Sequence, residues 1–430
     1  MSSSLQKAAH PHYHRRRAIA LAAALAAAAL SLTACGSSGK SASSATSAGA
    51  TTATTAPAGS AAAGSGATND TGLSTTLAQA LGTSSVPASS IPPIMSEALT
   101  IAGRSLTPAQ LSKALSCWKA TSCTLGSGNV TVAEADGFGG NTWRSFSKMN
   151  IILQALTYPQ IGKFIYTNAN GSLSTYESNI RELTAEGVKA IVAYNDFGPA
   201  AWPAFEAAQR SGAVVSTFVG PSDGAPTSAI TTRVQPDICQ VGKDMAAVTQ
   251  KVIGGNGPVA YFTGTPANPE DTGWQKCATD AGIQSVFNGT TNWTPSGAQQ
   301  AASALIASGK TVKAILYSYS NPVPNIVQAY QTAGKPIPAI IDWTTNNSTV
   351  CLLQQNHFTM YLTNALNWAA RVSLTALMDK IQGKSVPAAI YYPMPFFQAS
   401  ASQCTTGAPA DYPGPSALVP SSLVTQMLGS

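Results

Sequence analysis

The sequence of 430 residues predicts an α/β protein made of two doubly wound parallel-sheet lobes, with a small helical N-terminal extension. Three observations predict this fold class. From Asn129 onward, short runs rich in β-branched residues alternate with longer amphipathic stretches, a pattern typical of parallel sheets with helices on both faces. The alternation continues for about 270 residues, which is more than one typical domain contains. Residues 73–127 instead show helical patterning.

Each strand and helix of this alternation can be assigned in order along the chain. The predicted strands are 130–135, 161–167, 188–194, 213–219, 258–263, 312–317 and 337–343. The predicted helices are 142–156, 174–186, 200–211, 237–253, 270–281, 296–308 and 324–333. In the extension, Thr107 is expected to cap a helix that starts at Pro108.

The N-terminus has the three regions of a secretion signal. Lys7 and the arginines at 15–17 form a positive region, and residues 18–32 form an apolar stretch too short to span a bilayer of roughly 30 Å. The sequence Leu-Thr-Ala-Cys at 32–35 resembles a bacterial lipobox, which predicts a signal peptide at 1–34 and a lipid on Cys35. The alternative is an ordinary secretory signal followed by an incidental cysteine.

Residues 35–72 are expected to form a disordered tether, because a segment of Ser, Ala, Thr and Gly cannot bury enough apolar surface to fold. A glycan-bearing stalk is the alternative for this segment. The expected location of the protein is therefore the outer face of the cell membrane, on the periplasmic or extracellular side, attached through the lipid.

The charge of the chain argues against a nucleic-acid partner. The net charge is +6, but four positive charges and no negative ones lie in the leader, which leaves +2 for the remainder. Nucleic-acid binding requires clustered Lys and Arg on one face. The remainder also contains a single histidine, His357, which excludes mechanisms that need two.

Six cysteines remain after Cys35, an even number in an exported and oxidising setting. Three disulfides are expected, and of the 15 possible pairings we favour each cysteine with the next one along the chain. These pairs are Cys117 with Cys123, Cys239 with Cys277, and Cys351 with Cys404. A zinc site is disfavoured because no Cys-x-x-Cys pair is present.

Two glycine-containing segments suggest catalytic or cofactor sites at first sight, but neither fits. The segment 136–144 lacks the third glycine of a dinucleotide fingerprint, because Thr142 stands there. The segment 220–224 matches a hydrolase nucleophile elbow around Ser222, but no helix pattern follows it, and turn residues explain it. The sequence therefore predicts no catalytic residue, no cofactor and no metal.

Ligands of open parallel sheets lie beyond the carboxyl ends of the strands. At these positions the sequence places amides and carboxylates among aromatic rings, a mixture that suits a small polar ring compound such as a sugar. The candidate ligand-binding residues are Asn141, Trp143, Arg144, Asn195, Asp196, Phe218, Asp271, Trp274, Tyr319, Asp342, Trp343 and Asn364.

From about residue 129 to 398 the chain resembles a known family, the type I periplasmic binding proteins of sugar ABC importers, the ribose and galactose group. Gly-Asn-Thr-Trp-Arg at 140–144 is similar to a first ligand loop of such proteins. The strand at 312–317 and the helix ending in Thr-Ala-Gly at 332–334 are similar to another of their strand and helix units.

The resemblance implies two lobes joined by three crossovers that close on a ligand like a hinge. By position, one lobe comprises 128–233 and 364–388, and the other comprises 234–363 and 389–404, with a C-terminal tail at 405–430. Ribose-type members carry an Asp-Arg pair where Phe218 and Val219 stand here, and Asn-Asp near Tyr319. These differences from the ribose-type members indicate that the ligand is another sugar or a less polar ring compound.

The leading hypothesis is a monomeric solute-binding lipoprotein that delivers a small ligand, expected to be a sugar, to an ABC permease in the membrane. A second hypothesis gives the same fold a signalling role, in which the ligand is presented to a membrane receptor. An exported hydrolase using His357 and Ser222, and a wall-binding structural protein, are the remaining alternatives.

Overall fold

The computed structural model describes residues 70–220 and 222–429. The predicted signal peptide, Cys35 and the predicted tether up to residue 69 lie outside the described residues. Helix α1 (Asp70–Leu81) begins within the segment predicted as tether, so that prediction extends too far toward the C-terminus.

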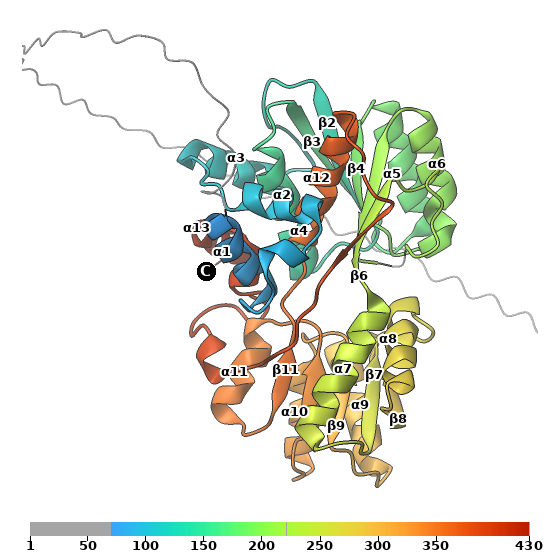
Figure 1. Ribbon diagram of the computed structural model, residues 1–430, viewed down its shortest axis with the longest axis vertical. Helices are drawn as coiled ribbons and strands as arrows, with labels where there is room; N and C mark the ends of the chain where they lie inside the picture. Colours follow the sequence, from blue (N-terminus) through green and yellow to red (C-terminus); the bar gives the residue numbers. More distant parts are fainter. Residues whose placement is uncertain (1–69, 221, 430) are drawn as a thin grey trace, which may run out of the picture. The chain divides into compact units, whose positions relative to one another are not determined.

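The first lobe contains a seven-stranded sheet in the order β1-β3-β2-β4-β5-β6-β12 (Figure 1). The strands are β1 (Ser122–Thr124), β2 (Val130–Asp136), β3 (Ile161–Asn168), β4 (Ala190–Tyr194), β5 (Val214–Phe218), β6 (Thr232–Pro236) and β12 (Ala389–Tyr392). All neighbours are parallel except β1, which is antiparallel to β3.

The side chains of β2 show how helices cover both faces of this sheet. Ala133 and Ala135 pack with α5 (Leu173–Ala185) and α6 (Trp202–Arg210), whereas Val132 packs on the side of α4 (Thr142–Ala155) and α12 (Ala369–Ile381). Because successive residues of a strand point to opposite faces, this apolar run is buried on both sides.

The second lobe contains a six-stranded sheet in the order β13-β11-β10-β9-β7-β8, parallel except for β13. The strands are β7 (Val259–Thr263), β8 (Ser285–Thr290), β9 (Ala314–Tyr317), β10 (Ala339–Asp342), β11 (Met360–Leu362) and β13 (Phe397–Gln398). One face is covered by α7 (Ile238–Ile253) and α8 (Pro269–Asp280), and the other by α9 (Pro295–Ala307), α10 (Val323–Thr332) and α11 (Asn347–Gln355).

Within the described residues the chain passes between the sheets after β6, after β11 and after β12. The predicted change of lobe at residue 389 is wrong, because β12 pairs with β6 in the first sheet and the chain crosses only after Tyr392. The parallel-sheet lobes and the extension are otherwise those of the predicted fold class.

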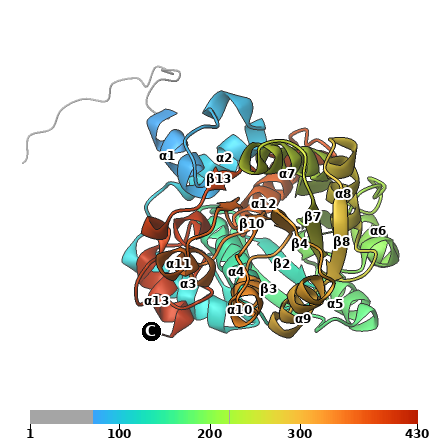
Figure 2. The same ribbon diagram turned by 90° about the horizontal axis from the view of Figure 1, so that it is seen from below.

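The N-terminal extension packs on the first lobe through α2 (Pro93–Ala102) and α3 (Pro108–Lys119), which contact α12 and α4. Thr107 forms the predicted cap: its side chain accepts from the Gln110 backbone, and the Gln110 side chain accepts from the Thr107 backbone. The C-terminal helix α13 (Ser421–Leu428) lies beside α3 (Figure 2).

The C-terminal tail contacts both lobes. The backbone N–H of Asn347, in the second lobe, donates to the Tyr412 carbonyl at 2.8 Å, while Asn150 of α4 donates to the Ala417 carbonyl at 3.0 Å. The tail therefore connects the lobes in addition to the crossovers.

The six described cysteines form the three pairs favoured from the sequence, Cys117–Cys123, Cys239–Cys277 and Cys351–Cys404. The first joins α3 to β1, the second joins α7 to α8, and the third fixes α11 to the start of the tail.

We predict that the Cys35→Ser protein has no thiol that reacts with Ellman's reagent until it is reduced, because all other cysteines are paired. Thiol titration under native conditions, before and after reduction, measures this. Two or more reactive thiols without reduction would contradict the pairing.

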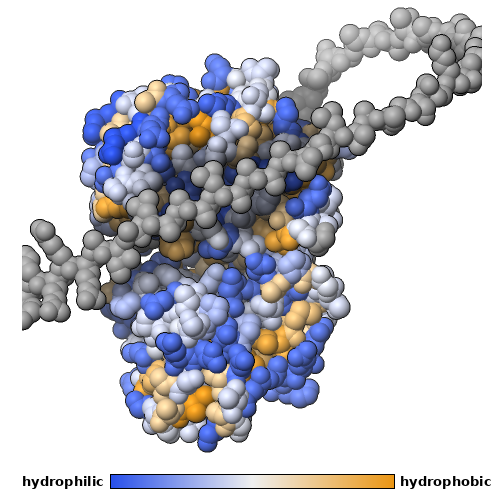
Figure 3. All heavy atoms as spheres, turned by 180° about the vertical axis from the view of Figure 1, so that it is seen from behind, coloured by the Kyte–Doolittle hydropathy of each residue, from blue (hydrophilic) through white to orange (hydrophobic). Residues whose placement is uncertain are grey.

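No described helix is both long enough and apolar enough to cross a membrane. On the face seen from behind, apolar residues occur in scattered spots among hydrophilic ones (Figure 3). Among the described residues, the large apolar side chains that are exposed are Phe138, Val286, Ile381 and Tyr391.

Candidate ligand-binding site

A cavity of about 650 Å³ lies between the two lobes. The first lobe lines it with residues from 138–144 after β2, 194–197 at the end of β4 and 219–220 after β5. The second lobe lines it with residues from 265–271 after β7, 292–294 after β8, 318–319 after β9 and 343–344 after β10. Since parallel sheets bind ligands at the carboxyl ends of their strands, this cavity is the candidate site.

The predicted site residues divide into two groups. Those that line the cavity are Asn141, Trp143, Arg144, Asp196, Asp271, Tyr319 and Trp343. Those that do not are Asn195, Phe218, Trp274, Asp342 and Asn364, all of which are buried in the protein.

Asn195 and Asp342 do not line the cavity, and the cause is the same for both. Each stands next to a residue that does line the cavity, Asp196 and Trp343. Successive side chains at a strand end tend to point in opposite directions, and here Asn195 and Asp342 point into the protein while the residue after each lines the cavity. Asn195 instead donates to the Gly198 carbonyl at 3.0 Å, and burial raises the pKa of Asp342 well above its ordinary value.

Phe218, Trp274 and Asn364 have structural roles. Phe218 lies behind Trp143, with ring centroids 6.2 Å apart and an interplanar angle of 12°. Trp274 is fully buried in the second lobe against Tyr261. Asn364 donates to the Gln79 carbonyl at 3.1 Å and so holds the end of α1.

Trp143 forms an aromatic wall of the cavity at the start of α4. Asn141 caps this helix by accepting from the Arg144 backbone N–H at 2.9 Å. The Trp143 ring is half-buried, stacked on Phe218 and in edge contact with Tyr194 at 5.6 Å between centroids. Its orientation is therefore set by packing, and it presents an aromatic surface to a ligand.

Arg144 is the centre of a buried ionic network. Its guanidinium pairs with Asp136 and with Asp196, each at 2.7 Å, and lies 3.3 Å from the centroid of the Tyr194 ring. Asp136 is fully buried and also accepts from the backbone N–H of Gly139 at 3.0 Å. The charge of Arg144 is thus matched within the protein and is not available to pair with an anionic ligand.

Of the predicted residues, the second lobe contributes the buried carboxylate of Asp271 and the aromatic rings of Tyr319 and Trp343. Asp271 accepts from the Gly264 backbone N–H at 2.8 Å and from the Trp274 indole at 3.0 Å. The Trp343 indole donates to the Ser318 carbonyl, which fixes the ring at the end of β10. Tyr319 is half-buried and accepts from Asn321 at 2.8 Å.

The charged residues that line the cavity are Arg144, Asp196, Glu270 and Asp271, with no lysine or histidine among them. Since Arg144 is matched by two carboxylates, the surface is net negative. Oxygen acceptors beside aromatic rings suit hydroxyl groups on a compact ring, whereas a carboxylate or phosphate on the ligand would be repelled.

Sequence reasoning missed several lining residues, among them Tyr194, Trp293 and Glu270. Tyr194 is the last residue of a predicted strand, one position before those that were selected. Trp293 follows β8, which was not predicted as a strand. Glu270 directly precedes Asp271 in the first turn of α8, so the same strand-end rule could have included it.

Glu270 reaches the first lobe from the second. Burial, together with the neighbouring charges of Asp271, Asp196 and Asp223, raises the pKa of Glu270 to about 7, although a hydrogen bond from the Gly220 backbone opposes the rise. Gly220 follows β5, so this hydrogen bond joins the two lobes across the cavity.

We predict that the stability of the protein relative to its Glu270→Gln variant falls as the pH rises. A carboxyl with a raised folded-state pKa stabilises the fold most at low pH, and here the loss runs from about pH 4.5 to about pH 7 and then levels off. The loss should be about 2 kcal/mol, less than the full shift implies because the side chain is partly exposed. Urea unfolding at several pH values measures it.

Glu182→Gln on the exposed side of α5 is the matched control and should change the profile little. A difference between the wild-type protein and Glu270→Gln that is independent of pH would contradict the assignment.

The geometry defines a class: a two-lobed binding protein with a ligand cavity at the facing strand ends. Residues 137–385 match the family model described as a periplasmic binding protein domain. This match covers more than half of the chain, and the chain belongs to this family. Membership in a family of binding proteins agrees with the prediction that it is not an enzyme, and places it outside the cytoplasm.

Solved structures with the same fold include three that are informative. The arabinose-binding component of an ABC transporter from Shewanella sp. ANA-3, bound to L-arabinofuranose, is 17% identical, with a TM-score of 0.56 over 63% of this chain and 92% of that one. A 5-methylthioribose transporter binding protein from Thermotoga lettingae is 17% identical, with a TM-score of 0.53 over 63% and 86%. The fructose-binding periplasmic domain of a hybrid two-component system is 15% identical, with a TM-score of 0.54 over 63% and 90%.

At these identities the likeness establishes the fold and not the ligand. No curated protein sequence matches the chain.

Proposed function

We propose that this protein is the lipid-anchored solute-binding subunit of an ABC importer, and that its interlobe cavity binds an uncharged sugar or a similar ring compound. Family membership supports the binding role, and the arabinose and 5-methylthioribose proteins with this fold both belong to transporters. The partners would be the ligand and a permease in the membrane.

The choice of an uncharged ligand rests on one observation, the pairing of Arg144 with two carboxylates. Arg144 forms two ion pairs, with Asp136 and Asp196, and it is the one cation among the described residues that line the cavity, while Trp143 and Trp343 provide aromatic surface. A neutral sugar can stack on aromatic rings and donate its hydroxyls to Asp196 and Asp271 without burying an unpaired charge.

Native mass spectrometry of the purified protein tests this proposal, since it detects a copurified ligand directly. We expect one neutral molecule per chain. In a second arm, ligand-free protein is titrated with pairs that differ only in charge, such as galactose and galacturonate, and we expect the neutral member of any pair that binds to bind more tightly. Preferred binding of the acid would contradict the proposal.

A signalling role remains the second candidate, because the fructose-binding domain with this fold belongs to a two-component system. The two roles differ in their partners. Copurification of the membrane-extracted protein with a permease and an ATPase supports import, whereas copurification with a receptor kinase supports signalling.

The membrane anchor is part of the same proposal and depends on Cys35. We predict that Cys35→Ala moves the protein from the membrane to the soluble fraction, because the thiol-linked lipid is the attachment that the sequence offers. Fractionation followed by a high-salt wash measures this, with Ser37→Ala as a control that should stay in the membrane fraction. Retention of Cys35→Ala in washed membranes would exclude the lipid as the anchor.

A further inference from the structure

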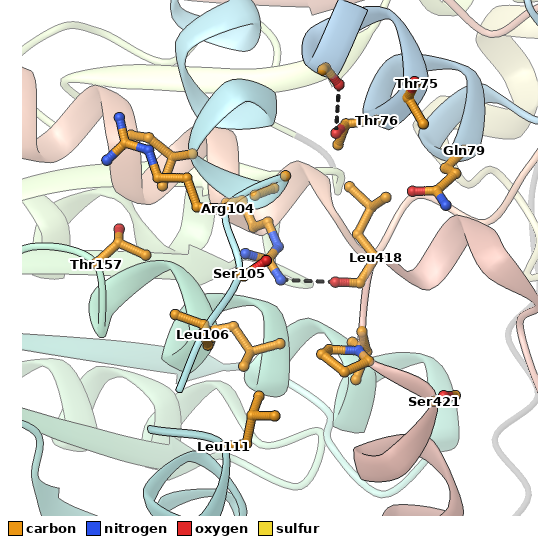
Figure 4. Close-up of a pocket in the computed structure, with 18 of the residues that line it drawn as sticks. Thr75, Thr76, Gln79, Arg104, Ser105, Leu106, Leu111, Thr157, Leu418 and Ser421 are labelled. Atoms are coloured by element: carbon orange, nitrogen blue, oxygen red, sulfur yellow. Dashed lines mark hydrogen bonds between the residues drawn. The ribbon is translucent and has the colours of Figure 1, made fainter. Parts of the chain in front are cut away.

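A second cavity, of about 840 Å³, lies on the first lobe away from the ligand cavity. Its walls come from α1, the connection between α2 and α3, α4, α12 and the C-terminal tail (Figure 4). The extension and the tail, which the ligand cavity does not use, therefore build this second cavity with the lobe.

The buried wall of the second cavity contains Arg371, whose exposed fraction is 3%. Its guanidinium donates to the side chains of Asn150 and Gln154 and, at 2.9 Å, to the Leu418 carbonyl. All three acceptors are uncharged. Among the described residues no carboxylate forms an ion pair with Arg371, whereas the buried Arg144 has two such partners.

The position of Arg371 on its helix also leaves its positive charge without compensation. It lies in the first turn of α12, where the helix dipole is positive and cannot stabilise a cation. Burial lowers its pKa to about 9, with no neighbouring charge acting against the shift. Three of its five N–H groups have acceptors, which leaves two without one among the described residues.

The remaining charged residue that lines the cavity is also an arginine. Arg104 is exposed, and its side chain has no hydrogen-bond or ion-pair partner among the described residues. Ser105 and Ser421 add hydroxyl groups to the lining, and Figure 4 places them and Arg104 around the pocket. The lining thus has two cations and no aspartate or glutamate, the reverse of the ligand cavity.

We propose that this cavity is a second ligand site that binds a phosphate-type oxyanion. A buried charge is costly unless it is paired, and the planar fork of an arginine matches the oxygens of a phosphate. The oxyanion supplies the counter-charge to Arg371, and Arg104 adds a second positive charge to the lining of the same cavity. Its source is either a free phosphate compound or the headgroup of an anionic phospholipid.

The test uses full-length Cys35→Ser protein, so that the lipid anchor does not contribute. Inorganic phosphate is titrated at constant ionic strength, with chloride as the balancing anion, while the melting temperature is followed. We expect a saturable rise in melting temperature, with an apparent affinity at least threefold weaker in Arg104→Gln. Arg181→Gln, which removes an exposed arginine of α5, is the matched control and should behave as the unsubstituted protein.

A second arm identifies the source. Protein is sedimented with vesicles of phosphatidylglycerol or of phosphatidylcholine. Binding to phosphatidylglycerol that Arg104→Gln weakens and Arg181→Gln does not weaken supports the headgroup, and a response to inorganic phosphate alone supports a free compound. No anion-specific response in either arm, or equal losses in both variants, would overturn the proposal. Arg371→Gln, if it folds, should lose the response altogether.

Discussion

Arg144→Met is expected to lower the free energy of unfolding by about 3–5 kcal/mol, the usual result of removing one partner from a buried ion pair. The substitution leaves Asp136 fully buried without its cation and frees Asp196 from the position that its 2.7 Å contact imposes. Ligand affinity should also fall by about tenfold or more, because Asp196 lines the cavity and would no longer be held. Urea unfolding and calorimetric titration measure the two effects.

The double variant Arg144→Met with Asp136→Asn separates charge from packing. Asparagine can still accept from the Gly139 backbone N–H but carries no charge, so the double variant should be more stable than Arg144→Met alone. Arg181→Met is the control, since exposed ion pairs such as Arg181 with Glu177 contribute only about 0.3–0.5 kcal/mol. Equal stability of Arg144→Met and the wild-type protein would show that the network is not needed for the fold.

Most of the α/β alternation could be predicted from the sequence, because its strands are buried on both faces and read as apolar runs. The strand predicted at 161–167 is β3 (Ile161–Asn168), and the helix predicted at 270–281 is α8 (Pro269–Asp280). The apolar pattern of these elements comes from their burial in the lobe. This burial does not depend on the ligand.

The elements that sequence reasoning missed lack such a pattern. Strand β8 (Ser285–Thr290) is an edge strand with alternate residues exposed, so it has no apolar run. Strand β6 (Thr232–Pro236) includes Arg233 and Gln235 because it leads out of the lobe. Helix α12 (Ala369–Ile381) is buried on almost all sides, so its apolar residues do not form a single stripe.

The ligand cavity was predictable by region but not by side chain. The rule that ligands lie beyond strand ends selects the loops that line the cavity. It cannot choose between Asp342 and Trp343, because these neighbours differ in the direction in which their side chains point. Trp274 follows a strand end in the sequence, but helix α8 turns its side chain into the core of the second lobe. Direction depends on the register of strands and helices, which tertiary packing decides.

Trp143→Ala is expected to weaken ligand binding by about tenfold. Trp143 lines the cavity, and an aromatic surface contributes about 1 kcal/mol or more beyond area burial, close to the 1.4 kcal/mol that corresponds to a factor of ten. The ring is half-buried and packs on Phe218 and Tyr194, so some stability should be lost as well. This loss should stay below the 3–5 kcal/mol of a fully buried tryptophan.

Two comparisons separate binding from packing at Trp143. Trp143→Phe keeps an aromatic face and should recover most of the affinity. Trp118→Ala removes a tryptophan of similar burial that lies in α3, outside the cavity, and donates to the Ser145 carbonyl at 3.1 Å. It should lower the melting temperature with little change in affinity. If Trp143→Ala behaves like Trp118→Ala, with a lower melting temperature and unchanged affinity for the copurified ligand, then Trp143 is a packing residue and the ligand lies elsewhere in the cavity.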